Sequence, residues 1–285
     1  MELPLPHRPP CASNGKKAIM ESTGAYRPAG SYPGNTMIDC IFSVCCRNET
    51  RKAIARRSLT SFFENTDTSR VRTLAIFDGG DNFSSEFPFD YVLSHKESLG
   101  VALSLNTALD IIRARDRYFV KEGRNPRASA RTEYISYHQD DLLYSKGWLD
   151  KCVGAFKRFP TAAFVTGWKN DHSDHPVSRQ EGDHMLKLTL SGQHLMASRE
   201  YWFSLDPMTM LYGWSAGILP YEPHRGGPEN PFDERGNPGP NRKCSRFDWY
   251  LMIDNPRSPV LTGRFNVALD VITNIGKEES TWQNG

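Results

Sequence analysis

Residues 38–49 read IDCIFSVCCRNE, an almost wholly apolar run that stops abruptly at a polar triplet. The apolar part, Ile38 to Cys46, is short and contains β-branched residues, which is typical of a strand covered on both faces in a parallel sheet. Residues 50–64 then place apolar side chains at helical spacing, namely Ala53, Ile54, Leu59, Phe62 and Phe63. The stretch therefore predicts a buried strand followed by a helix.

The same order of elements continues along the chain. Further strands are predicted for residues 71–77, 91–93, 134–138, 162–166, 186–190, 195–197 and 267–272. Helices are predicted for residues 101–114, 148–159, 199–205 and 247–253, and residues 167–183 are a polar stretch. Alternating strands and helices indicate an α/β fold, a mostly parallel sheet flanked by helices, with ligands at the carboxyl ends of the strands.

Two segments contain too many prolines and glycines for regular structure. Residues 1–36 are expected to form a disordered N-terminal arm, and residues 220–244 a long loop that is either functional or disordered. The length of 285 residues suits one such domain, which we place at residues 37–285.

Composition excludes several classes of function. The 35 Lys and Arg residues nearly balance the 33 Asp and Glu residues, so the net charge of +2 gives no strong signal for nucleic acid or anionic lipid. No apolar stretch approaches the roughly 18 residues of a membrane span, and the first ten residues lack the apolar core of a signal peptide. The six cysteines form no CxxC pair. We therefore expect a cytoplasmic protein with reduced thiols and no transmembrane segment.

Polar residues follow three of the predicted strands directly. They are Arg47-Asn48-Glu49, Asp78-Gly79-Gly80-Asp81 and His138-Gln139-Asp140-Asp141. In a parallel sheet these strand ends meet at one edge. Adjacent carboxylates such as Asp140 and Asp141 are costly there unless a cation lies between them, and a hard divalent ion bridging phosphate oxygens is the usual solution. The pair therefore predicts a Mn²⁺ or Mg²⁺ site.

The order of these clusters resembles the GT-A fold glycosyltransferases, in particular the inverting family two, over about residues 38–255. The resemblance implies a Rossmann-like domain with a nucleotide-binding part at residues 37–145 and an acceptor-side part at residues 146–285. It implies a nucleoside-diphosphate sugar as donor and a glycan or other hydroxyl compound as acceptor. The nucleotide-sugar site that it implies consists of Arg47, Asn48, Glu49, Asp78, Gly100, Asn106, Gln139 and Asp140.

The same resemblance implies a catalytic base. Asp248 matches the second member of the family's acidic pair before a helix, which deprotonates the acceptor hydroxyl. Trp202 and Trp214 lie in the stretch that shapes the acceptor side and could stack on a sugar ring or belong to the core. The sequence departs from the family at three positions: Leu105 replaces an Arg, and His138 and Phe247 each replace an Asp or Glu.

Several residues also have simpler interpretations. Asp140 and Asp141 could cap a helix starting near Ser145, Asp78 could be a turn residue, and Asp248 could be a charge at a helix start. Two other functions stay open. A nucleotidyltransferase would want a Gly-rich phosphate loop after the first strand, which here has basic residues, Arg47, Arg51 and Lys52, but no such loop. A carbohydrate- or nucleotide-binding module with a decayed catalytic set is the non-enzymatic alternative.

Overall fold

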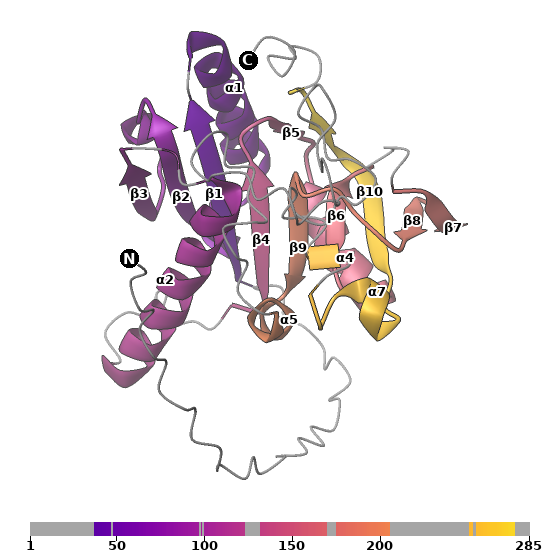
Figure 1. Cartoon of the computed structure of the whole chain (residues 1–285). Coiled ribbons are helices and arrows are strands. Elements are labelled where there is room, and N and C mark those ends of the chain that lie inside the picture. Colours follow the sequence, from indigo (N-terminus) through magenta and orange to yellow (C-terminus); the bar gives the residue numbers. More distant parts are fainter. Residues whose placement is uncertain are drawn as a thin grey trace, which may run out of the picture. The chain divides into compact units, whose positions relative to one another are not determined.

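The computed structural model describes residues 37–46, 48–96, 98, 100–122, 132–169, 175–205, 251–252 and 255–276, with side chains of the 101–122 helix described as far as residue 116. These residues form one ten-stranded sheet in the order β3-β2-β1-β4-β9-β6-β10-β8-β7, with β5 paired to β10 (Figure 1). The predicted arm at 1–36 lies outside the described residues, and the domain boundaries stay a prediction.

One half of the sheet is entirely parallel. It contains β1 (Ile38–Cys46), β2 (Val71–Gly80), β3 (Tyr91–His95) and β4 (Tyr134–Gln139). β1 lies in the centre, with Ile38 level with both Val71 of β2 and Tyr134 of β4. The carboxyl ends of β1, β2 and β4 therefore reach the same edge of the sheet.

The other half mixes directions. Its strands are β5 (Leu142–Tyr144), β6 (Val165–Trp168), β7 (Val177–Glu181), β8 (His184–Lys187), β9 (His194–Ser198) and β10 (Asn266–Asn274). From the strand pairings within the described chain, seven strands run in one direction, and β5, β8 and β9 run in the other. The sheet is mostly parallel, as predicted. β7 lies within the polar stretch of residues 167–183, where its exposed and mostly polar residues give no strand pattern in the sequence.

Helices cover both faces of the sheet. The longer ones are α1 (Glu49–Asn65), α2 (Val101–Glu122) and α4 (Trp148–Arg158), and the shorter ones are α5 (Arg199–Ser204) and α7 (Pro259–Thr262). Two 3₁₀ turns, η1 (Thr68–Arg70) and η2 (Ser84–Glu86), flank β2. No helix of the described part is long and apolar enough to cross a membrane.

β1 is buried on both faces, which explains its continuous apolar run. Phe42 packs in a cluster with Phe62 of α1 and Trp148 of α4. Ile41, on the other face, packs in a second cluster with Leu105 of α2. The two clusters form the core on either side of the sheet, so the polar ends of the strands are the places where chemistry can lie.

The amino ends of these strands contain a buried ionic network. Asp39 accepts hydrogen bonds from both terminal nitrogens of Arg115 at 2.8 Å, from Arg72 at 3.1 and 3.4 Å, and from the Thr132 hydroxyl at 2.6 Å. Arg199 lies 3.5 Å from the same carboxylate. The network ties β1, β2, α2 and α5 together at the edge of the sheet opposite the candidate site.

Candidate functional site

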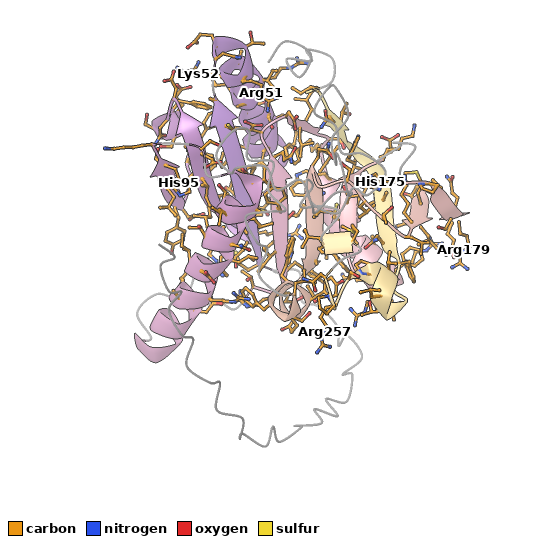
Figure 2. The ribbon with its side chains drawn as sticks, in the orientation of Figure 1. Arg51, Lys52, His95, His175, Arg179 and Arg257 are labelled. Atoms are coloured by element: carbon orange, nitrogen blue, oxygen red, sulfur yellow. The ribbon has the colours of Figure 1, made fainter. Side chains whose placement is uncertain are left out.

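Hydrogen bonds join three strand ends and the first turn of α1. The backbone N–H of Cys45 donates to Oδ2 of Asp140 at 2.9 Å, which links β1 to the residue that follows β4. The N–H of Asp81, just beyond β2, donates to the carbonyl of Cys46 at 3.3 Å, and Nζ of Lys52 donates to Oδ2 of Asp81 at 2.7 Å. Figure 2 shows Arg51 and Lys52 together at this end of the molecule. The polar clusters predicted at the ends of β1, β2 and β4 do meet at one edge.

Arg51 is the cation that faces the two carboxylates. Its Nη2 donates to Oδ1 of Asp140 at 2.6 Å, and its Nη1 lies 3.8 Å from Oδ2 of Asp141. Within the described chain, this buried Nη1 has no hydrogen-bond partner. Burial works to lower the pKa of Arg51, but the charges of Asp140 and Asp141 outweigh it and raise that pKa above its ordinary value. The sequence shows Arg51 as a basic residue, but no local pattern places it beside Asp140.

The N-cap of α1 fixes the position of the Arg51 backbone. Asn48 is the N-cap of α1, and its side-chain oxygen accepts the N–H of Arg51 at 2.8 Å. Glu49, the first residue of the helix, is exposed, and its nearest ion-pair contact is Lys52 at 3.8 Å. Asn48 thus positions the backbone of Arg51, whereas the exposed Glu49 side chain lies near Lys52.

Asp141 is enclosed by the end of β10. Its carbonyl accepts the N–H of Ile275 at 2.9 Å, and its Oδ1 lies 3.5 Å from the side-chain nitrogen of Asn274. A Cβ added to Gly276 would clash with Oδ2 of Asp141, so a larger residue there would displace that carboxylate. Neither aspartate caps α4, because that helix begins after Gly147 and has no side-chain cap. The capping interpretation of the pair is wrong.

The carboxylate pair is short of positive charge. Burial raises the pKa of Asp140, and the contacts from Arg51 and Cys45 oppose that rise without cancelling it. For Asp141, burial and then the neighbouring charge of Asp140 raise the pKa to about 6. One guanidinium therefore does not fully neutralise two buried carboxylates, and the site favours a further cation or a proton.

Asp78 organises the loop before α2. Its carboxylate accepts hydrogen bonds from the Ser98 hydroxyl at 2.9 Å and from the Gly100 N–H at 2.8 Å, and lies 3.0 Å from Nδ1 of His95. Gly79 has a φ of +77°, and a Cβ there would lie 2.8 Å from the Ser98 nitrogen. Asp78 is buried, so the structure gives it the role of holding the start of α2 beside the strand ends.

The remaining predicted residues divide into three groups. Gln139 and Asn106 are partly exposed, the first at the end of β4 and the second on α2. Trp202 is a core residue, since its buried indole donates to the carbonyl of Ile135 at 2.8 Å. This corrects its assignment to the acceptor side. Arg47, Trp214 and Asp248 lie outside the described residues.

His138 also belongs to the core, although it stands where the family has its first Asp. Its ring stacks on Phe42 with centroids 4.8 Å apart, and its Nδ1 lies 2.9 Å from the Tyr144 hydroxyl. Burial lowers the pKa of His138 well below its ordinary value, so the ring is neutral. His138 is therefore not a ligand partner of Asp140.

Asp140 and Asp141 suit a hard cation that is coordinated both by the protein and by a substrate. Asp140 and Asp141 supply carboxylate oxygens, but within the described chain no group of three or more His, Cys, Asp or Glu side chains is placed to hold a metal ion. Mg²⁺ and similar ions are commonly held by one or two carboxylates together with substrate phosphates, so two carboxylates are a sufficient protein contribution. Such an ion would bind Asp140, which is already paired with Arg51.

No protein-family model matches the chain, and no curated protein matches it. Solved structures do. The mannosyltransferase PcManGT from Pyrobaculum calidifontis, in complex with GDP-Man and Mn²⁺, is similar over 62% of this chain and 48% of its own, with 14% identity and a TM-score of 0.43. S. aureus TarS is similar over 57% of this chain and 28% of its own, with 11% identity and a TM-score of 0.38. The chain thus matches less than half of the length of either protein, and these distant likenesses concern the arrangement of sheet and helices.

Proposed function

We propose that the protein transfers a sugar from a nucleoside-diphosphate donor to a hydroxyl group of an acceptor. One observation carries the proposal: the ends of β1, β2 and β4 meet at an edge where a buried carboxylate pair, Asp140 and Asp141, faces one guanidinium among the described residues, that of Arg51. Ligands of α/β sheets bind at this edge. An under-neutralised carboxylate pair suits a ligand that brings its own cation, as a diphosphate does.

The reaction makes defined demands on the site. The bond between the anomeric carbon and the diphosphate oxygen breaks, and the diphosphate leaves with the electron pair and an added negative charge. A divalent ion held by Asp140 and Asp141 would supply neutralising charge to that leaving group. Arg51 adds a guanidinium beside the same position, and the N-terminal end of α1, a 17-residue helix, favours anions through its dipole.

The acceptor side of the proposal comes from the sequence resemblance alone. The acceptor oxygen attacks the anomeric carbon from the face opposite the diphosphate, and its proton passes to Asp248. A single displacement of this kind inverts the configuration. The loop that Asp78 holds before α2 would contact the nucleotide side of the donor, through Gly100 and Asn106.

The test is binding followed by turnover. UDP-, GDP- and dTDP-sugars are screened by thermal shift with and without Mn²⁺. We expect one nucleotide class to stabilise wild type by several degrees, because saturation at about 100 times Kd contributes roughly 2.7 kcal/mol. Asp140→Ala should lose this stabilisation, whereas Asp150→Ala, which removes an exposed carboxylate of α4, should keep it.

Release of the nucleoside diphosphate from the stabilising donor separates an enzyme from a binding module. We expect slow hydrolysis without acceptor and inverted stereochemistry when an acceptor is supplied. Stabilisation without any turnover across a panel of glycan acceptors would favour the binding module. If no nucleotide sugar stabilises the wild-type protein, the proposed function is refuted.

A further inference from the structure

Arg51 lies at an unfavourable place for a positive charge. It is the third residue of α1, and its own N–H is bonded to the N-cap Asn48. The amino end of a helix is the positive end of its dipole, so a cation there is disfavoured. The compensating contact is with Asp140, 89 residues away in sequence, at 2.6 Å. The carboxylate pair therefore determines where this guanidinium lies.

The carboxylates do not depend on Arg51 for their positions. The Cys45 N–H holds Oδ2 of Asp140, and the end of β10 encloses Asp141 through Ile275 and Gly276. A divalent ion could thus replace the guanidinium at Oδ1 of Asp140 without rebuilding the strand ends. A long arginine side chain has the reach and rotamer freedom to move when its partner is taken.

One of the two terminal nitrogens of the guanidinium has no hydrogen-bond partner among the described residues. Nη2 is bound to Asp140, but the buried Nη1 donates no hydrogen bond to any described residue and lies 3.8 Å from Asp141. A buried donor without a partner is costly, and a phosphate oxygen is a strong acceptor for a guanidinium. Nη1 of Arg51 could therefore donate to a phosphate oxygen of a ligand bound at the strand ends.

We propose that Arg51 is an exchangeable counter-cation: it pairs with Asp140 and Asp141 in the free protein, gives up Asp140 to a divalent ion, and then binds the donor diphosphate. The inference rests on the proposed function for the identity of the diphosphate. The part of the inference that concerns the divalent ion rests only on the ion pair of Arg51 and Asp140. Arg51 thereby competes with the metal and binds the nucleotide. Removing its side chain should therefore strengthen metal binding and weaken nucleotide binding.

The first measurement uses Mn²⁺ alone, titrated by calorimetry into wild type, Arg51→Ala and Arg51→Lys. Removing the competitor should raise the Mn²⁺ affinity of Arg51→Ala about tenfold or more, since a charge-assisted hydrogen bond to Asp140 no longer opposes the metal. Arg51→Lys should lie between the two. Arg56→Ala is the matched control, because Arg56 lies on the same helix and pairs with Glu86.

The second measurement uses UDP and GDP in the presence of saturating Mn²⁺. Arg51→Ala should bind the accepted nucleotide about 10- to 100-fold more weakly than wild type, in spite of its tighter hold on the metal. A merely structural Arg51 would weaken both ligands together. Should Arg51→Ala fail to fold, Arg51→Gln, which keeps the length of the side chain and removes its charge, takes its place in both titrations.

The outcomes separate the two proposals. Equal or weaker Mn²⁺ binding by Arg51→Ala, or unchanged nucleotide binding, overturns the exchange while the proposed function stands. If wild type binds neither nucleotide nor any nucleotide sugar, the proposed function fails and the diphosphate half of the inference fails with it. Tighter Mn²⁺ binding joined to weaker nucleotide binding supports the inference in full.

Discussion

The two ends of β1 each hold buried carboxylate and arginine side chains, but the charges balance differently. At the amino end, Asp39 and the nearby Asp116 face three arginines, and a threonine hydroxyl also donates to Asp39. At the carboxyl end, Asp140 and Asp141 share one arginine among the described residues. Within the described chain, the two carboxylates at the amino end thus have more arginine charge around them than the two at the carboxyl end.

The pKa values follow this difference. Burial alone would raise the pKa of Asp39, but the hydrogen bonds and charges of Arg115 and Arg72 outweigh burial and lower it. Burial and the adjacent Asp140 charge raise the pKa of Asp141 to about 6. A saturated network stabilises the fold and has no vacancy for a ligand. An unsaturated pair costs stability, which is the usual mark of a site built for binding.

The largest expected effect comes from breaking the saturated end. Asp39→Asn should lower the free energy of unfolding by about 3 to 5 kcal/mol, because three buried guanidinium groups lose the carboxylate that they share, and Asp116, which also pairs with Arg115 and Arg199, is a single, partly exposed carboxylate. Urea denaturation followed by circular dichroism measures it. A loss below about 1 kcal/mol would show that the network does not hold the amino ends of the strands together.

The unsaturated end should respond in the opposite direction. Asp141→Asn removes a carboxylate whose pKa is raised from 3.8 to about 6, so the variant should be more stable than wild type at pH 7, by about 1 to 3 kcal/mol. Below pH 4, where the carboxyl is protonated in both the folded and the unfolded chain, the difference should vanish. The gain should therefore grow as pH rises through the window between about 4 and 6.

Urea titrations of wild type and Asp141→Asn at pH 3.5, 5 and 7 measure this effect. The sign at Asp39 is reversed, since a lowered pKa gives stability that is present above about pH 4 and is lost as pH falls through the folded value. A variant that is less stable than wild type at pH 7 would contradict the view that Asp141 is short of positive charge.

The sequence predicts the sheet well and the pairing of charges poorly. The apolar run of β1 and the helical spacing after it indicate strand and helix without ambiguity, because burial on both faces leaves a local pattern. Asp140 and Asp141 could be found for the same reason, as they directly follow β4. Their roles in metal and donor binding stay predictions.

Long-range contacts leave no such pattern. An arginine in the first turn of a helix resembles a surface charge, and only the fold brings Arg51 to Asp140. His138 follows a strand pattern and precedes acidic residues, so the sequence groups it with the site, whereas stacking on Phe42 and the Tyr144 hydroxyl put it in the core. The sequence does not single out Asp39, because its three arginine partners are spread over residues 72–199.

The smallest expected effect is at a third carboxylate–arginine pair, Glu86 and Arg56. This pair distinguishes the contribution of bond geometry to stability from that of burial. Glu86 accepts two hydrogen bonds from Nε and Nη2 of Arg56, at 2.8 and 2.7 Å, so this pair is bidentate with distances close to the 2.8 Å of the bidentate pair of Arg115 and Asp39. Both members of the Glu86 pair are exposed, so water and salt compete with the contact. Glu86→Gln should therefore unfold at the same urea concentration as wild type, within experimental error, while Asp39→Asn does not. If Glu86→Gln lost as much stability as Asp39→Asn, geometry and not burial would decide what an ion pair contributes, and the contrast between the two ends of β1 would need another cause.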